Sequence, residues 1–427
     1  MQSLLQKLID KKKQILKELD AHPDPKIMPS MRMGLEIEID GYSDLLEYAR
    51  EGKPILGHFP SNGLARAMGA LPILYQDPLL CDPDPEIGIQ LYQIAHDMGM
   101  PDYMCDVFTL PAAAVKAGFY PPPQVTTSGT GGACRVWMYH MKAFSQYFEE
   151  NAKVPAFEID TPEEYSWESI MYMADQLADF VKFVEKNVPG TKYDEEEHKR
   201  IIADNRIWVD YALKDWELKK HVPMGLSNLE NALLPLHFDI NLFGKREKVL
   251  EWWKQRVVDT EARIAQGGNK NEKLRILWLN PLPLYFDIFS LLDKLGVSML
   301  MWIPPLAPLN GWRAPWGDEK EFGRKLTPLE EEARFMFGDI YGTKEWADEV
   351  VWMCKDLKID ALVYYQLVGC IHIGGPFRMV ADVVEKELGL QTLILPPARL
   401  YDSAPLPPAE LESRLTDFVE MVMARKG

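Results

Sequence analysis

From residue 274 to the C-terminus, short apolar runs alternate with amphipathic runs of helical length. The apolar runs are LRILWLN, VSMLMWIPP, DALVYYQLVGC and TLILPPARLYDS. The amphipathic runs are YFDIFSLLDKLG, EWADEVVWMCKDLK, PFRMVADVVEKELG and ELESRLTDFVEMVMARK. Parallel strands need long crossover connections, and a helix is the usual connection. The alternation therefore predicts a doubly wound parallel sheet.

The first 165 residues show a weaker version of the same alternation. KPILGHFPSNGLARAMGALPILY has the pattern of strand, turn, helix and strand. PPPQVTTSGTGGACRVWMYHMKAFSQYFEE has the pattern of strand, Gly-rich turn and helix, and the strand-like VPAFEID follows it. The region from Ser166 to Asn271 has helical periodicity and few strand signals. We therefore expect an α/β fold with two parallel-sheet domains of Rossmann or flavodoxin type, a helical middle and N-terminal helices.

A chain of 427 residues suits two or three domains. We place an N-terminal helical segment at 1–45 and a first α/β domain at 46–165. A helical region follows at 166–270, and a second α/β domain occupies 271–427. Within the N-terminal segment we expect one helix, a Pro-rich turn and a second short segment.

The chain is acidic, with a formal net charge of −17. Such a surface repels phosphate backbones and anionic lipid heads, which counts against nucleic-acid or membrane binding. The longest apolar stretches, near Val297–Pro305 and Ala361–Cys370, are too short to span a bilayer. The first residues, MQSLLQKLIDKKKQILKELD, carry charges throughout and lack the apolar core of a signal peptide. We therefore expect a cytoplasmic protein.

The chain has five cysteines and no CxxC pair, which is a poor pattern for a disulfide framework or a zinc ribbon. Cys105 precedes a predicted helix, Cys134 follows a Gly-rich turn and opens another, and Cys370 ends an apolar strand. Ligands of open α/β sheets gather at the carboxyl ends of strands, and a helix N-terminus favours the thiolate that a metal requires. These three cysteines are therefore candidates for one shared site.

Glycines next to two of these cysteines would let the backbone approach a bulky metal cluster. Soft thiolates select iron–sulfur clusters or zinc. The alternative is a set of ordinary turns with buried cysteines, since glycine is common in turns and free cysteine is usually buried. Cys354 lies on an amphipathic helix and is predicted to be a core residue, whereas Cys81, in a Pro- and Asp-rich loop, is undecided.

Several long segments together resemble the 2-hydroxyacyl-CoA dehydratase and class I benzoyl-CoA reductase family. GHFPSNGLARAMGALPILY resembles the family's opening strand, turn and helix. The region from PDYMCDVFTL through TTSGTGGACRVW to VPAFEID resembles its two-cysteine core. DALVYYQLVGC, LGLQTLILPPARLYDS and ESRLTDFVEMV resemble its third-cysteine strand and closing segments. The resemblance covers nearly the whole chain.

The resemblance implies a [4Fe–4S] cluster with Cys105, Cys134 and Cys370 as ligands. It also implies a heterodimer or heterotetramer with a homologous second subunit, and a separate ATP-hydrolysing iron–sulfur activator. Family members act on acyl-CoA thioesters through a ketyl radical. This chain contains no GxxxxGK[ST] motif, which agrees with ATP hydrolysis on another protein. Three thiolates would leave one iron open to water or a substrate oxygen.

The sequence departs from the common family pattern at three places. Arg135 follows Cys134 where Asp is frequent, PSNG replaces a Pro-Glu turn, and LNPLPLYFDI replaces a Gly-Cys-Pro type. Three readings stay open: a lyase that dehydrates an (R)-2-hydroxyacyl-CoA, a subunit of an ATP-dependent benzoyl-CoA reductase, and a non-catalytic electron-transfer module. The first is the main hypothesis.

Other residues are weaker candidates. His58, Ser61 and Asn62 follow the first strand and are assigned to substrate binding, although Ser61 or Asn62 could equally cap a helix. His372 could donate to a cluster sulfur or to substrate, or lie on the surface. The segment MGLSNLENALLPLHFDINLFG could line an acyl pocket or simply pack on the sheet. No catalytic acid or base is assigned.

Overall fold

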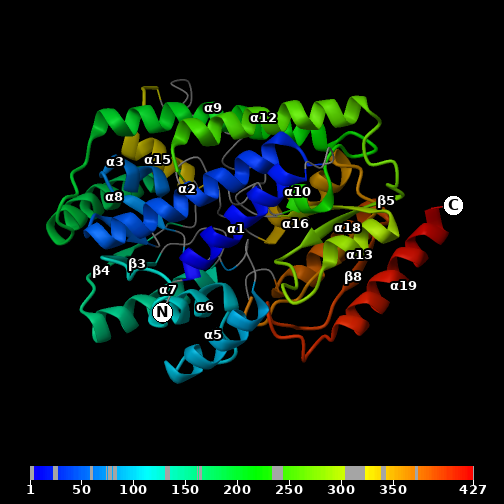
Figure 1. Ribbon diagram of the computed structural model, residues 1–427, viewed down its shortest axis with the longest axis horizontal. Helices are drawn as coiled ribbons and strands as arrows, with labels where there is room; N and C mark the ends of the chain where they lie inside the picture. Colours follow the sequence, from blue (N-terminus) through cyan, green and yellow to red (C-terminus); the bar gives the residue numbers. More distant parts are fainter. Residues whose placement is uncertain are drawn as a thin grey trace.

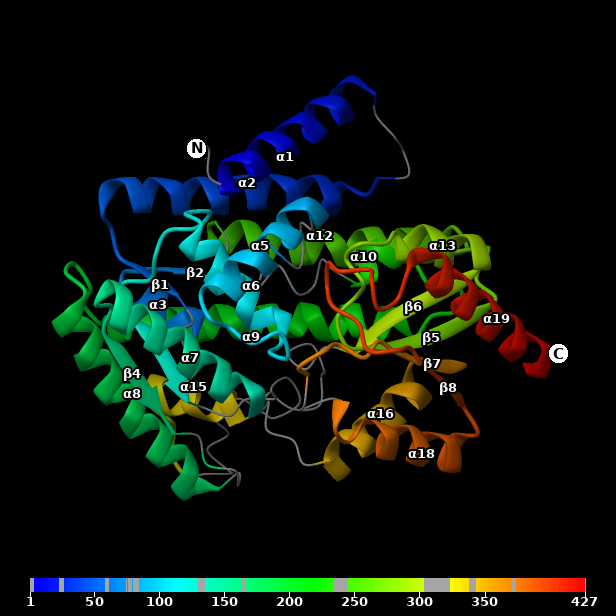
Figure 2. The same ribbon diagram turned by 90° about the horizontal axis from the view of Figure 1, so that it is seen from below.

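The computed structural model describes residues 4–22, 27–57, 61–73, 75, 79, 84–129, 135–160, 162, 166–232, 244–302, 323–337, 343–370 and 374–426. Figure 1 shows long helices along one edge of the molecule and a sheet toward the C-terminal side. In Figure 2 the early strands lie in one lobe and the late strands in another, and long helices run across both.

The late strands form a four-stranded sheet in the order β6-β5-β7-β8, with every pairing parallel. The strands are β5 (Leu274–Leu279), β6 (Val297–Trp302), β7 (Ala361–Tyr364) and β8 (Gln391–Ile394). In register, Leu279 lies opposite both Trp302 and Tyr364. The order places the first strand between the second and third, as in flavodoxin-like sheets. The parallel α/β fold predicted from the sequence is confirmed.

The apolar run of β5 is buried on both faces of the sheet. Ile276 and Trp278 belong to one hydrophobic core and Leu277 and Leu279 to another, because successive side chains of a strand point to opposite faces. The first core also contains residues of α13 (Ile288–Leu295) and α19 (Pro408–Lys426). The second contains residues of α16 (Thr343–Asp356) and α18 (Phe377–Leu388). Helices therefore cover both faces.

In the first half, the described strands form two parallel pairs. These are β1 (Ile55–Gly57) with β2 (Leu71–Ile73) and β3 (Thr126–Gly129) with β4 (Ala156–Ile159). The helices between them are α3 (Asn62–Ala67), α5 (Pro85–Asp97), α6 (Asp106–Lys116) and α7 (Arg135–Ala152). The strand–helix–strand units predicted here are present.

The predicted helical middle consists of α8 (Trp167–Asn187), α9 (Glu195–Lys219), α10 (Asn228–Ala232) and α12 (Arg246–Ala265). α9 packs along α12, and the two run across both lobes (Figure 2). Between them the buried Arg256 donates from Nε to Asp215 at 2.8 Å. The helix α15 (Pro328–Phe337) was not expected, and it packs on α8 and α9. Its Ala333 joins the core of the first half, so that core draws on a much later segment.

The N-terminal segment is a helical hairpin of α1 (Leu4–Ala21) and α2 (Pro29–Glu51). Lys12 and Glu38 form a buried ion pair of 2.6 Å between them. The expected short second segment is wrong, because α2 has 23 residues and extends past residue 45. Gly34 and Gly41 weaken its helical pattern in the sequence, but both are buried on the helix. Packing of α2 on α12 outweighs this low intrinsic propensity.

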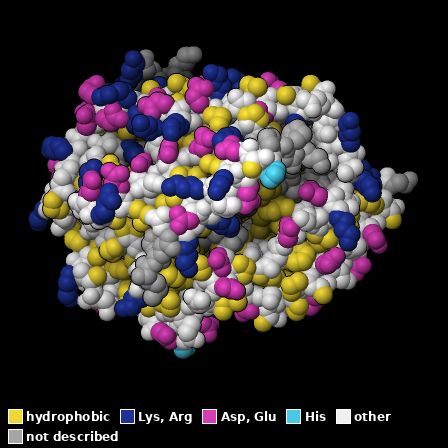
Figure 3. Space-filling view, in the orientation of Figure 1, with side chains coloured by type: hydrophobic (Ala, Val, Ile, Leu, Met, Phe, Trp, Pro, Cys, Tyr) yellow, Lys and Arg dark blue, Asp and Glu magenta, His cyan; other side chains and the backbone are white. Residues whose placement is uncertain are grey.

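Charged side chains of both signs cover the upper edge of the face in Figure 3, where α9 and α12 run. Hydrophobic side chains are more frequent in the lower part of that face. Among the residues that the structure describes, no helix is long and apolar enough to cross a membrane.

Candidate metal centre

Cys105 stands at the start of α6, as the sequence predicted. It occupies the N-cap position in extended backbone (φ −67°, ψ 127°), and its side chain makes no capping hydrogen bond. Its carbonyl oxygen accepts from Phe108 N at 3.0 Å and from Thr109 N at 3.2 Å, which starts the helix. Cys105 is in no disulfide, and only 4% of the residue is exposed. The partial positive charge of the helix N-terminus favours a thiolate at this position.

Cys370 lies beyond the carboxyl end of β7, in a turn that leads to α18. The extension of β7 stays attached to the chain after β8, since Leu367 and Ala398 form a parallel bridge. Cys370 N then donates to Leu367 O at 3.1 Å, and Gly374 N donates to Cys370 O at 2.9 Å. Cys370 is in no disulfide and is half-buried. It packs against the same hydrophobic core that contains Cys105.

The segments that carry these two cysteines are in direct backbone contact. Gly369 has φ +78°, and a Cβ atom there would lie 2.4 Å from Cys105 N and 2.5 Å from Met104 C. Both the left-handed backbone and the close approach require glycine. Figure 2 shows the segment before α6 and the segment after β7 approaching each other at the centre of the molecule. We call this contact the cysteine junction (residues 103–106 and 367–370).

A buried ion pair stabilises the cysteine junction. Asp106 is completely buried, and Arg399, from the loop after β8, donates to its Oδ1 from Nε at 3.1 Å and from Nη2 at 2.7 Å. The other carboxylate oxygen accepts from Leu400 N at 2.9 Å and from the Tyr92 hydroxyl at 2.7 Å. Arg399 also lies 4.0 Å from the Tyr92 ring centroid. The residue after Cys105 is thus tied to the late sheet by charge-assisted hydrogen bonds.

Two polar residues at the carboxyl edge of the late sheet face the Cys370 turn. Asn280 follows β5 with φ +81°, is 4% exposed, and donates from Nδ2 to Tyr365 O at 2.9 Å. Its Oδ1 lies 3.8 Å from Cys370 Sγ, which donates to it as a thiol. Tyr364, the last residue of β7, is buried. Burial, and next the charge of Cys370, raise the pKa of Tyr364.

Cys134, the third expected ligand, lies outside the described residues, between the end of β3 at Gly129 and the start of α7 at Arg135. No group of three His, Cys, Asp or Glu residues suited to a metal ion occurs in the described ranges, which hold only two of the three predicted ligands. The donors that are described fit an iron–sulfur cluster: two cysteines in no disulfide, on touching segments, with glycine at the contact.

The residues assigned to substrate binding are only partly described. Ser61 caps α3, since its hydroxyl accepts from Leu64 N at 3.1 Å. This is the helix-cap alternative, and Asn62 is the first residue of that helix. His58, His372 and Cys81 lie outside the described residues, as does the part of the suggested acyl segment after α10.

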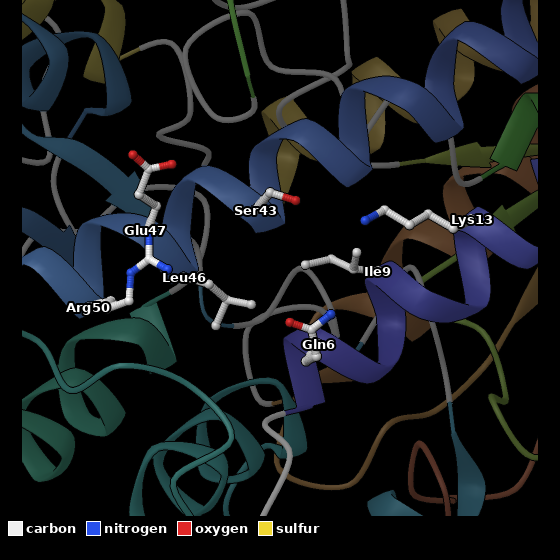
Figure 4. A pocket seen from close by; sticks show the side chains of 7 residues that line it. All are labelled: Gln6, Ile9, Lys13, Ser43, Leu46, Glu47 and Arg50. Atoms are coloured by element: carbon white, nitrogen blue, oxygen red, sulfur yellow. The ribbon is translucent and has the colours of Figure 1, made fainter.

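A groove of about 530 Å³ lies between α1 and α2 (Figure 4). It is lined by Gln6, Ile9, Lys13, Ser43, Leu46, Glu47 and Arg50. The side chains come from two neighbouring helices and include both cationic and anionic groups, with no residue of the cysteine junction. It is therefore separate from the candidate metal centre.

Sequence reasoning missed Asp106, Arg399, Asn280 and Tyr364. Asp106 follows Cys105 directly, but acidic residues are common in the first turn of any helix. Asn280 had a signal, because Asn before Pro at the end of a strand is typical of a turn and Asn tolerates positive φ.

The fold and the junction define a parallel α/β protein in which two cysteine-bearing segments, far apart in the sequence, are in contact beside the carboxyl edge of a sheet. The model of the family described as 2-hydroxyglutaryl-CoA dehydratase, D-component, matches residues 59–422, and the chain belongs to this family. A search of curated proteins finds no match. The family match supports the resemblance inferred from the sequence and includes every residue of the cysteine junction. It leaves α1, α2 and β1 outside.

Proposed function

We propose that this chain is the [4Fe–4S] subunit of an ATP-activated radical enzyme that acts on acyl-CoA thioesters. The reaction is dehydration of an (R)-2-hydroxyacyl-CoA to an enoyl-CoA. The observation that carries the proposal is the contact between Gly369 and the backbone of Met104 and Cys105, within a chain of the dehydratase family. This contact brings together the segments that carry two of the three cysteines that the resemblance assigns to a cluster.

Cys105, Cys134 and Cys370 would hold the cluster, and three thiolates leave one iron free for water or a substrate oxygen. When bound, the cluster supplies a single electron at low potential. One electron on the thioester carbonyl gives a ketyl radical, which eases the loss of hydroxide from the α carbon and of a proton from the β carbon. The net reaction is the loss of one water, and the electron is regained.

The chain's own residues shape the site before any chemistry occurs. Asp106 and Arg399 hold the Cys105 helix against the late sheet. Asn280 holds the end of β5 to the backbone after β7 through Tyr365 O. Cys105 is buried and Cys370 half-buried, so the junction restricts water around the thiols.

The proposed partners are a homologous second subunit and a separate ATP-hydrolysing iron–sulfur activator, in the cytoplasm of a cell with anaerobic metabolism. The family is described as a component of a dehydratase, which supports assembly with other chains. It also favours dehydration over reduction of an aromatic thioester. Benzoyl-CoA reduction and a non-catalytic electron-transfer role are therefore outcomes that the experiment must separate.

The test is anaerobic reconstitution of this chain with its second subunit and activator. The products from a 2-hydroxyacyl-CoA and from benzoyl-CoA are measured with and without ATP. We expect ATP-dependent enoyl-CoA formation. Ring reduction would assign the benzoyl-CoA reductase class instead. A cluster-loaded assembly that converts neither thioester would contradict the proposed enzyme and favour an electron-transfer module.

A further inference from the structure

Tyr364 is the last residue of β7 and lies at the carboxyl edge of the late sheet. Only 2% of it is exposed, and its ring stacks on Phe377 with centroids 3.6 Å apart. Its hydroxyl has no hydrogen-bond partner within the described part of the chain. Buried polar groups normally have a hydrogen-bond partner. An unpaired hydroxyl in a well-packed sheet therefore indicates a partner from outside the described residues, such as a bound group.

The Tyr364 hydroxyl points to the turn that begins at Cys370. A Cβ atom on Gly374 would lie 3.2 Å from the hydroxyl oxygen. Gly374 N in turn donates to Cys370 O at 2.9 Å. The phenol therefore lies beside the segment that carries a proposed cluster ligand.

Three other buried tyrosines do have partners. Tyr365, the next residue, donates to Arg399 O at 2.7 Å. Tyr75 donates to Pro121 O at 3.0 Å, and Tyr401 donates to Leu79 O. Tyr364 is as buried as these three tyrosines, but its hydroxyl has no partner in the described part of the chain.

Asn280 also contacts Cys370, but it does not offer a hydrogen-bond donor to the sulfur. Its Nδ2 is held by Tyr365 O, so Oδ1 faces Cys370 Sγ and accepts the thiol proton. That proton leaves when a thiol binds a metal, and Oδ1 has none to give. The Tyr364 hydroxyl, at the end of β7 and beside the same turn, still has a proton to donate when Cys370 binds a metal.

We propose that Tyr364 donates a hydrogen bond to a sulfur at Cys370, either the ligand thiolate or a sulfide of the cluster, and thereby raises the reduction potential. The inference rests on the proposed function, because it needs a cluster on Cys370. A hydrogen bond to sulfur stabilises the reduced, more negative state, which is why such bonds tune cluster potentials. Tyr364 acts through the cluster and positions no substrate.

The experiment compares the wild type with Tyr364→Phe and with the matched control Tyr285→Phe. The Tyr285 hydroxyl is paired, since it donates to Leu406 O at 2.8 Å. Each protein is purified without oxygen, its iron and sulfide are counted, and its cluster is titrated with reductant under electron paramagnetic resonance. We expect Tyr364→Phe to keep its iron, to show a lower midpoint potential and to shift the g values. Tyr285→Phe should match the wild type in all three.

The unfolding free energy of the cluster-free proteins gives an independent readout. Removal of an unpaired hydroxyl should leave Tyr364→Phe as stable as the wild type or more stable, whereas Tyr285→Phe should be less stable. An iron-loaded Tyr364→Phe with unchanged potential and spectrum would overturn the inference and leave the proposed function standing. A wild type that binds no iron would overturn both. Destabilisation of cluster-free Tyr364→Phe equal to that of the control would show a paired hydroxyl and overturn the inference alone.

Discussion

Arg275 at the amino end of β5 and Tyr364 at the carboxyl end of the neighbouring β7 differ in how completely their polar atoms are paired. At the amino end, Arg275 of β5 is buried and all three of its guanidinium nitrogens are paired. Its Nε donates to Glu272 at 2.8 Å, and its Nη1 donates to Lys219 O at 2.8 Å and Leu357 O at 3.0 Å. Its Nη2 donates to His221 O. Glu272 also accepts from Met224 N and from the Ser298 hydroxyl.

At the carboxyl edge of the sheet, polar side chains have missing or weak hydrogen bonds, and one residue has an unusual backbone conformation. The Tyr364 hydroxyl is without a partner in the described ranges, Asn280 holds a left-handed backbone, and Cys370 has a weak 3.8 Å contact. Unpaired groups and unusual backbone persist where function requires them. The comparison indicates that the amino edge was built for stability and the carboxyl edge for a ligand, in agreement with the usual place of ligands in open α/β sheets.

The largest expected effect is on stability, at the amino edge. Arg275→Met leaves the Glu272 carboxylate buried without its cation, and should lower the free energy of unfolding by about 3–5 kcal/mol. Chemical denaturation measures the loss, and Lys273→Met at the exposed neighbouring position is the control. The protein that still folds should keep its full iron content. Equal stability of the two variants would break the comparison.

The next largest expected effect is on both the free energy of unfolding and the iron content. Arg399→Met removes the partner of the buried Asp106, and should cost about 2–3 kcal/mol, as expected for hydrogen bonds to a charged group. Because this pair holds Cys105 against the Cys370 turn, iron per folded chain should also fall. Arg378→Met breaks an exposed ion pair to Asp382 and should change neither quantity. Full iron loading in Arg399→Met would show that the pair is not needed to shape the site.

The smallest effect separates backbone strain from hydrogen bonding at Asn280. Asn280→Gly loses the bond to Tyr365 O and should cost about 1 kcal/mol, since glycine tolerates positive φ. Asn280→Ala loses the same bond and also holds a left-handed backbone, so it should cost about 2 kcal/mol. Urea unfolding of both variants gives the difference. Identical losses would mean that the conformation of residue 280 carries no cost.

The sequence predicted the late sheet well because each apolar run is short, bounded and followed by an amphipathic run. It also predicted that Cys105 precedes a helix and that Cys370 follows a strand, since helical periodicity marks the first and an apolar run with flanking glycines marks the second. It could not predict α15 beside α8, because helical pattern fixes an element and not its neighbour. For the same reason, nothing in the chain marked Asp106 and Arg399 as partners across nearly 300 positions.

The most direct test counts iron and sulfide in four anaerobically purified variants, Cys105→Ala, Cys134→Ala, Cys370→Ala and Cys354→Ala. Cys354 is buried in α16, and burial raises its pKa to about 12, so it is the matched control that should never bind metal. We expect near four irons per chain and a cluster signal in the wild type and in Cys354→Ala, with loss of both in the other three. Equal iron in all four variants would contradict the assignment of the cluster to Cys105, Cys134 and Cys370.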